Sequence, residues 1–266
     1  MNAPVHTKPL SQRKITLRAF SERMAAERHR WIERNAYFYE DDRRYMRFLV
    51  PEGARVLELG CGIGDLLAAL KPSLGIGVDF SPAMLEQARS RHPHLQFVLG
   101  DVEDPSVIQG LTGPFDYIVL SDTIGAFDDC EATLASLQPL CHRETRLIVS
   151  YYSHLWEPIL TFGSWIGLRM PQVEQNFLPP VDIQNLLALA DFEVLKREWR
   201  WRFEARLEGR GSAGSLCKPD LRRDPNLPVP ARSSSDTHGC VRLSQIQGSV
   251  ELLLFHQPDI YILCRS

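Results

Sequence analysis

The sequence predicts a doubly wound α/β fold with a mainly parallel sheet and helices at the N-terminus. Two observations support this prediction. From residue 55 to residue 152, short apolar runs alternate with amphipathic helical segments, which is typical of parallel strands buried on both faces. Before them, residues 18–49 have apolar side chains at helical spacing, ended by the breakers Pro51 and Gly53.

Each element within this pattern has its own local signal. The apolar runs that predict strands are residues 55–59, 74–80, 95–101, 115–122 and 145–152. The segments that predict the intervening helices are residues 64–70, 81–92 and 131–141. Ser81 and Pro82 are the residue types of a helix N-cap and a first helical position. In doubly wound folds the ligand binds at the carboxyl ends of the strands, so we expect the site residues there.

The pattern becomes less regular after Tyr152. A helix is predicted over residues 181–192 and one long strand over residues 193–207. The segment that follows is rich in Gly, Ser, Pro and Arg and has no periodicity. The predicted division of the chain is an N-terminal helical extension (1–50), a ligand-binding core (51–204), an irregular, disordered or aberrant segment (205–255) and a candidate final strand (256–266).

Composition excludes several classes of protein. The 266 residues are 44% hydrophobic and 24% charged, with a net charge of -3, which argues against broad nucleic-acid binding. No run approaches the ~20 apolar residues of a membrane span, and no secretory signal is present, so we expect a cytoplasmic protein without an integral membrane span. The basic first residues leave a transit peptide as an alternative. The six cysteines lack CxxC spacing and a histidine cluster, so we expect neither disulfides nor a metal site. Nothing in the sequence indicates an oligomeric state.

A glycine-rich turn follows the first predicted strand. In the stretch VLELGCGIGDLL, residues 56–67, Gly60, Gly62 and Gly64 alternate, and such a turn lets a ligand approach the backbone. A dinucleotide motif has the spacing GxGxxG, whereas the third glycine here comes one residue early. The carboxylate of Glu58 would repel a pyrophosphate and attract a cation. The turn therefore favours a ligand that carries an amine or a sulfonium group.

Two further acids follow strands. Asp79 ends the second strand about 20 residues after the first glycine, where an acid can bind both hydroxyls of a ribose; a helix-entry aspartate is the alternative. Asp101 ends the third strand, and its carboxylate would accept from an adenine amino group while the Val102 N–H donates to the ring. A common turn aspartate is the alternative for Asp101. Together with the glycine turn, these residues predict an adenosine pocket.

Four motifs resemble, in order and spacing, those of class I S-adenosylmethionine-dependent methyltransferases. They are VLELGCGIGDLL, GVDFSPAMLEQAR, FVLGDVED and FDYIVLSD. The resemblance covers residues 50–200 and implies S-adenosyl-L-methionine as the cofactor of the core at residues 51–204. It also implies a Rossmann-like methyltransferase fold with a seven-stranded, mainly parallel sheet. FEVLKREWRW and DIYILCRS are the candidates for its final antiparallel hairpin.

The same resemblance implies roles for individual residues. Those near the methionine end would be Glu58, Gly60, Cys61, Gly62 and Gly64. Those at the nucleoside end would be Asp79 on the ribose, Phe80 against the adenosine, and Asp101 with Val102 on the adenine. Ser121 and Asp122, which end the fourth strand, would face the methyl group and the acceptor, and Asp122 is a candidate catalytic residue.

Candidates for acceptor binding come from less regular segments. His154 follows the fifth strand and is the candidate general base, which a hydroxyl acceptor would need and an amine would not; a packing histidine is the alternative. Trp156, Glu174 and Asn176 lie where a segment covering the substrate is expected, with loop capping as the alternative. Tyr37 and Tyr39 would approach the cofactor from the N-terminal helices, with core packing as the alternative.

Two further segments, one at the N-terminal border of the core and one in its C-terminal half, resemble a bacterial methyltransferase group often linked to glycosyltransferases. They are WIERNAYFYEDDRRYMRFLVPEG and the stretch from SYYSHLWEPIL to LALADFEV. This implies a small-molecule, glycan or lipid-linked acceptor, although the chain departs from such relatives after about Arg202. The expected function is therefore transfer of a methyl group from S-adenosylmethionine. The alternatives are an NAD-dependent oxidoreductase with a Rossmann turn and a non-catalytic S-adenosylmethionine-binding protein.

Overall fold

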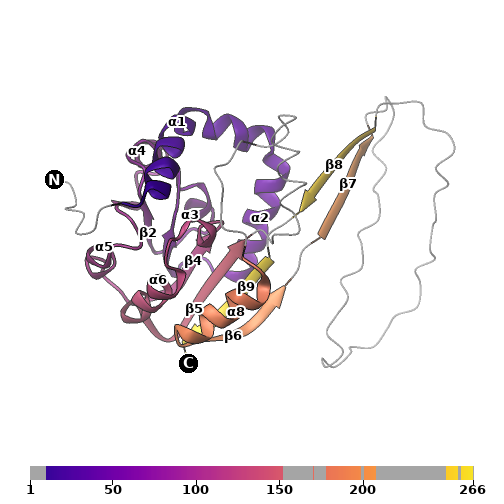
Figure 1. The fold of residues 1–266 in the computed structure, drawn as a ribbon. Coiled ribbons are helices and arrows are strands. Elements are labelled where there is room, and N and C mark those ends of the chain that lie inside the picture. The colour runs from indigo at the N-terminus through magenta and orange to yellow at the C-terminus, as the bar shows by residue number, and fades with distance from the viewer. Residues whose placement is uncertain are drawn as a thin grey trace, which may run out of the picture. The chain divides into compact units, whose positions relative to one another are not determined.

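Five apolar runs form parallel strands in the computed structural model of the chain (Figure 1). These strands are β1 (Arg55–Leu59), β2 (Leu74–Asp79), β3 (Gln96–Leu99), β4 (Phe115–Ser121) and β5 (Cys141–Tyr151). They pair in the order β3-β2-β1-β4-β5, so the direction of winding reverses between β1 and β4. This order confirms the predicted doubly wound parallel sheet, and it opens a crevice for a ligand at the carboxyl ends of β1 and β4.

The structure describes residues 10–151, residue 170 and residues 178–198, together with the backbone of strands in residues 201–207, 250–256 and 259–265. Strand β9 (Asp259–Arg265) pairs antiparallel with β5 on one side and with β6 (Phe192–Glu198) on the other. A separate two-stranded sheet contains β7 (Trp201–Leu207) and β8 (Val250–His256). Most of this second sheet belongs to a second compact unit, residues 203–254.

The prediction of one long strand over residues 193–207 is therefore wrong. Strands β6 and β7 lie in different sheets, because each pairs with a different segment far along the chain, β9 and β8 respectively. The local sequence gives only the extended conformation, whereas the partner of a strand depends on distant residues.

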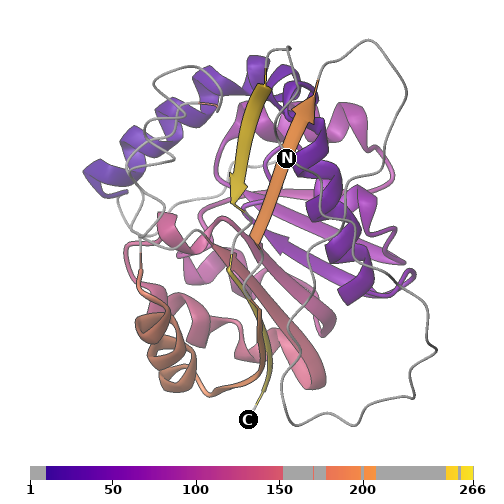
Figure 2. The same cartoon turned by 90° about the vertical axis from the view of Figure 1, so that its right-hand side faces the viewer.

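Helices cover both sides of the parallel sheet (Figure 2). Among the described residues, the α-helices are α1 (Gln12–Arg34), α2 (Ala36–Leu49), α3 (Asp65–Ala69), α4 (Pro82–Arg91), α5 (Pro105–Gln109), α6 (Cys130–Ser136) and α8 (Pro180–Leu189). Two short 3₁₀ helices are η1 (Ile124–Ala126) and η2 (Gln138–Leu140). The predicted cap of α4 is confirmed, because Ser81 Oγ accepts a hydrogen bond from the Met84 N–H at 3.4 Å.

Alternation along the strands explains why both faces are buried. On one face of the sheet, Leu57, Ile118 and Leu147 pack with Leu134 of α6 and Leu187 of α8. On the other face, Val56, Val119 and Ile148 pack with Met46 of α2 and Leu67 of α3. Full burial of one such side chain stabilises the fold by about 2 kcal/mol. This two-sided packing fixes the strands whose carboxyl ends hold the site.

The first helix lies against the glycine turn and α4. Ala25 and Ile32 of α1 pack with Ile63 of the turn and Met84 of α4 in one buried cluster. Asn35 separates α1 from α2, and its side-chain amide donates to the Trp31 carbonyl at 3.0 Å. In the described part of the chain, no helix combines the length and apolar character that a membrane crossing needs.

Candidate functional site

A pocket of about 400 Å³, open solvent included, lies at the carboxyl ends of β1, β2, β3 and β4. The residues that line it are Lys14, Leu17, Gly60, Asp79, Phe80, Gly100, Asp101, Val102, Thr123, Ala126 and Phe127. Five of these were predicted from the sequence as cofactor-binding residues, and they come from three different strand ends. The pocket lies where a doubly wound sheet is expected to bind a ligand.

The glycine turn is shaped by backbone conformations that other residues adopt with strain. Gly60 and Gly62 have φ values of 76° and 53°, in the left-handed region. A side chain at Gly60 would collide with the Thr123 side chain, whereas a side chain at Gly62 would meet no atom within 4 Å. Gly60 therefore permits close approach of the β1 and β4 ends, and Gly62 leaves an open surface beside the pocket.

Asp79 joins this turn to the end of β2. Its side chain is buried, and its carboxylate accepts hydrogen bonds from the Gly62 N–H at 2.8 Å and the Ser81 N–H at 2.9 Å. Burial raises the pKa of the Asp79 carboxyl, and these two backbone donors oppose the rise. The oxygens of the Asp79 carboxylate keep further acceptor positions that face the pocket. These positions suit the hydroxyl groups of a neutral ligand.

The loop after β3 contributes the other predicted acid. Asp101 is buried, and one of its carboxylate oxygens accepts from the Glu103 N–H at 3.0 Å. Val102 follows it in the pocket wall, and Phe80 contributes an aromatic ring from the end of β2. A carboxylate, a backbone segment and an aromatic ring around one pocket are a set of groups that binds a flat ligand with an amino group.

Glu58 is a buried residue of β1, one position before the strand ends. It is absent from the pocket wall in the described part of the chain, and it shares the sheet face of Val56, which packs with α2 and α3. Burial raises the pKa of the Glu58 carboxyl to about 8, against a lowering by the hydrogen bond from the Leu67 backbone N–H. Nearby Asp79 and Asp42 raise the pKa further. At neutral pH Glu58 is therefore mostly protonated.

The remaining turn residues have structural surroundings. The Cys61 side chain is buried with Leu85 and Ala88 beneath the turn, so only its backbone belongs to the turn surface. Burial raises the pKa of the Cys61 thiol well above its usual range, which leaves it unreactive. Gly64 caps α3 with a φ of 76°.

Ser121 and Asp122 end β4 beside the pocket and not in its wall. Asp122 has a φ of 54°, and its N–H donates to the Ser150 carbonyl at 2.9 Å. The next residue, Thr123, lines the pocket, and its hydroxyl lies 2.9 Å from the Leu59 carbonyl. The chain thus turns sharply at Asp122 and directs the following residue to the pocket.

The two predicted tyrosines differ in their surroundings. Tyr39 packs against the cluster of Ala25, Ile63 and Met84, and the Arg28 guanidinium lies 5.9 Å from its ring centroid. Tyr37 is 39% exposed at the start of α2. Neither lines the described pocket.

The candidate acceptor residues from the irregular segment fall outside the described residues. They are His154, Trp156, Glu174 and Asn176.

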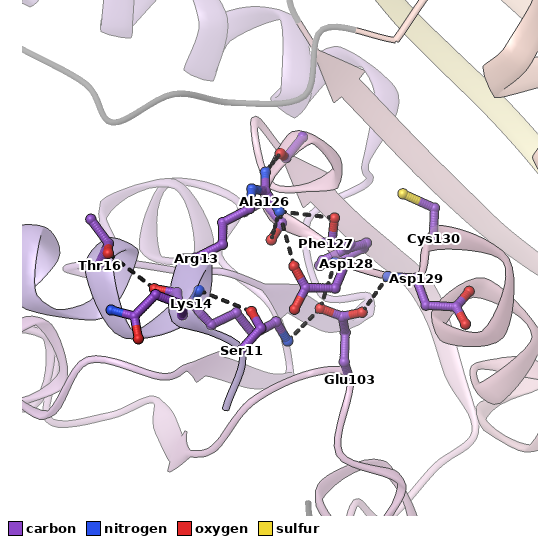
Figure 3. A network of polar contacts seen from close by, with 12 residues as sticks. Ser11, Arg13, Lys14, Thr16, Glu103, Ala126, Phe127, Asp128, Asp129 and Cys130 are labelled. Atoms are coloured by element: carbon purple, nitrogen blue, oxygen red, sulfur yellow. Dashed lines mark hydrogen bonds and ion pairs between the residues drawn. The ribbon is translucent and has the colours of Figure 1, made fainter. Parts of the chain in front are cut away.

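Several lining residues were missed by the sequence analysis. Lys14 of α1 and Phe127, which follows η1, are two of them (Figure 3). Leu17 of α1 is another. A local signal existed for the start of α1, because Ser11 Oγ caps it by accepting from the Lys14 N–H at 3.2 Å. The sequence offers no signal that this helix returns to the pocket, because the contact joins residues far apart in the chain.

Comparison with known proteins gives the family of this fold and site. A model of the methyltransferase domain matches residues 29–197, more than half of the chain. A trans-aconitate 2-methyltransferase from Variovorax paradoxus is 43% identical over 74 residues, which are 24% of this chain and 29% of that relative. The chain thus spans less than a third of that curated relative's length.

Two solved structures share the fold over most of the chain. An S-adenosylmethionine-dependent methyltransferase from Thermotoga maritima is 20% identical, with a TM-score of 0.57 over 94% of this chain and 99% of that one. Magnesium protoporphyrin IX methyltransferase from Synechocystis PCC 6803, solved with bound S-adenosylmethionine, is 14% identical, with a TM-score of 0.56 over 98% of this chain and 100% of that one. The family model, the strand order and the glycine turn agree, and the chain belongs to the methyltransferase domain family of class I S-adenosylmethionine-dependent enzymes.

Proposed function

We propose that the chain binds S-adenosylmethionine in the pocket at the carboxyl ends of β1 to β4 and transfers its methyl group to a small-molecule acceptor. The observation that supports this most is the convergence of Asp79, Phe80 and Asp101 on one pocket beside the glycine turn. These groups fit an adenosine: Asp79 can accept from ribose hydroxyls, Asp101 can accept from the adenine amino group, and Phe80 supplies an apolar face.

The methionine end would lie along the turn from Gly60 to Gly64. There the open surface at Gly62 leaves room for a ligand against the backbone. Glu58 lies behind the turn, where a cationic amino group would favour the ionised form of its carboxyl. We assign Glu58 to the methionine end through electrostatics rather than through contact.

The cofactor, when bound, supplies an activated methyl group on a sulfonium. The residues of this chain bind, orient and exclude water around it. Ser121 and Asp122 stand next to the pocket at the end of β4, where an acceptor would approach. For a hydroxyl acceptor we propose Asp122 or His154 as the group that takes the proton.

The proposal also concerns the kind of molecule that accepts the methyl group. A glycan or a lipid-linked molecule is proposed as an alternative to a free small molecule. This rests on the motif resemblance of the segments at residues 31–53 and 150–194. The curated relatives act on trans-aconitate and magnesium protoporphyrin, and their alignments cover 24% and 27% of this chain. Those names therefore give no acceptor for this chain.

Isothermal titration calorimetry of the full chain with S-adenosylhomocysteine and with NAD tests the cofactor. We expect micromolar binding of S-adenosylhomocysteine, none of NAD, and loss of binding in Asp79→Asn. The exposed Asp182→Asn in α8 is the matched control and is expected to bind like the wild type. Binding of NAD alone would overturn the proposal. A radiolabelled methyl donor offered with pools of small molecules, glycans and lipids then tests turnover, and its complete absence would leave a non-catalytic binder.

A further inference from the structure

We propose that Lys14 is a positioning residue of the cofactor site: it orients the Asp101 carboxylate and holds the first turn of α1 over the adenine end of the pocket. The inference rests on the proposed function. Lys14 is 7% exposed, and its ammonium forms ion pairs with the carboxylates of Asp101 and Glu103. It also lines the same pocket as Asp101.

A buried ammonium is stable only when it is paired, because removing an isolated charge from water costs several kcal/mol. Both partners of Lys14 are themselves buried or anchored. The Glu103 carboxylate accepts from the Asp128 N–H at 2.9 Å and from the Asp129 N–H at 2.7 Å (Figure 3). The ammonium therefore sits between two fixed acids, and its position relative to the pocket is defined.

The same contacts orient the adenine-binding acid. One oxygen of Asp101 accepts from the Glu103 N–H and the other pairs with Lys14. An ionised carboxylate offers about four acceptor positions. Two are used by the protein, so capacity remains for an amino donor, and the plane of the carboxylate is fixed before the ligand arrives.

Arg13 anchors the helical turn that carries Lys14. Its guanidinium donates to the carbonyls of Gly125, Ala126 and Phe127, and it pairs with the Asp128 carboxylate at 3.3 Å (Figure 3). Although burial opposes it, hydrogen bonds from Ser11 and Arg13 lower the pKa of Asp128, so this partner stays ionised. The start of α1 is thus fastened to the loop after β4 as well as to the loop after β3.

This arrangement has a consequence for the ligand. Lys14 and Leu17 form the α1 side of a pocket whose other walls hold Phe80, Asp101 and Val102. A nucleoside bound there is covered by α1, and it leaves when the Lys14 and Arg13 contacts open. Retention of the cofactor then depends on residues that precede the family's sequence motifs.

The test measures S-adenosylhomocysteine binding and dissociation in Lys14→Met, Lys14→Arg and Arg18→Met, by calorimetry and stopped flow. We expect at least tenfold weaker binding and faster dissociation for Lys14→Met. Lys14→Arg should restore most of the affinity, because it keeps the charge. Arg18 lies on the same helix and pairs with the exposed Glu22, so Arg18→Met is the matched control and should bind within twofold of the wild type.

A coupling measurement separates positioning from a general structural role. In an Asp101→Asn background, Lys14→Met should weaken S-adenosylhomocysteine binding little further, because each change alone already removes the Lys14–Asp101 ion pair. Additive losses would overturn the proposal. Hydrogen exchange can be measured on the wild type, without a variant that might misfold. S-adenosylhomocysteine should slow the exchange of the backbone amides of residues 14–20. Unchanged exchange of these amides would overturn the proposal.

These outcomes are distinguishable from failure of the proposed function. A wild type that binds no S-adenosylhomocysteine overturns both the proposed function and the role of Lys14. A wild type that binds, with a Lys14→Met variant that binds and releases equally, overturns the role of Lys14 alone.

Discussion

The Gly62 N–H donates to the Asp79 carboxylate at 2.8 Å, so the glycine turn after β1 is tied to the end of β2. One side chain therefore both shapes the turn and faces the pocket. Backbone strain, buried acids and the proposed cofactor meet in this region.

Replacing Gly60 and Gly62 with alanine should distinguish the cost of backbone strain from the cost of a steric collision. Gly62→Ala should cost about 1–2 kcal/mol of unfolding free energy, because only its left-handed backbone is disfavoured. Gly60→Ala should cost more, because the new methyl group also meets the Thr123 side chain. Urea unfolding measures both values.

A second change at Thr123 provides the control for this comparison. Thr123→Ala removes the colliding atoms, so part of the loss in Gly60→Ala should be recovered in the double variant. Equal losses in Gly60→Ala and Gly62→Ala, or strict additivity with Thr123→Ala, would contradict the close approach of these strand ends.

Stability should fall with rising pH because of Glu58. The pKa of its carboxyl is about 8 in the folded chain, against an ordinary value of 4.5 when the chain is unfolded. Between these values the folded state binds more protons than the unfolded state, so the unfolding free energy decreases as pH rises from about 4.5 to 8. The total is on the order of 4 kcal/mol.

Glu58→Gln removes this titration and keeps an acceptor for the Leu67 N–H. The difference in unfolding free energy between Glu58→Gln and the wild type should therefore grow from about pH 5 to about pH 8. Titrating groups that do not interact with Glu58 cancel in this difference. A pH-independent difference would show that Glu58 ionises normally in the folded protein.

Cofactor binding should release a proton from Glu58 near neutral pH. A cationic amino group at the methionine end favours the carboxylate, so a carboxyl with a pKa of about 8 loses its proton on binding. The binding enthalpy of S-adenosylhomocysteine should then vary with the ionisation enthalpy of the buffer. Glu58→Gln should abolish that variation, and an equal slope in both proteins would place the amino group away from Glu58.

Two of the described cysteines, Cys61 and Cys130, should resist alkylation in the folded protein. Burial raises the pKa of the Cys61 thiol well above its usual range and that of the Cys130 thiol to about 11. Iodoacetamide at about pH 8 should therefore modify both slowly in buffer and rapidly in urea, as followed by peptide mass spectrometry. Fast modification of Cys61 in the native protein would mean that the turn opens.

The sequence was sufficient where local patterns decide structure. The run RVLEL predicted β1 with its observed bounds, and Ser81 with Pro82 predicted the start of α4. Asp79 and Asp101 were expected in one pocket because the carboxyl ends of parallel strands meet at one sheet edge, and the structure brings them together.

The sequence was insufficient where distant segments decide structure. Lys14 resembles a solvated lysine of a basic N-terminal segment, and only the folded chain pairs it with Asp101 and Glu103. Thr123 was missed because its role comes from contact with Gly60 of another strand. The split of residues 193–207 into β6 and β7 likewise depends on pairing with later strands.

The docking of α1 constrains the order of events during synthesis. Arg13 and Lys14 bind partners in residues 101–128, so the first turn of α1 cannot dock until these residues have left the ribosome. During that interval Ala25 and Ile32 can already pack with Ile63 and Met84, whereas Leu17, which lines the pocket with Val102 and Phe127, remains uncovered. Exposed apolar helices of nascent chains are sites of aggregation and chaperone binding. The start of α1 is thus protected later than the part of the same helix that packs with α4.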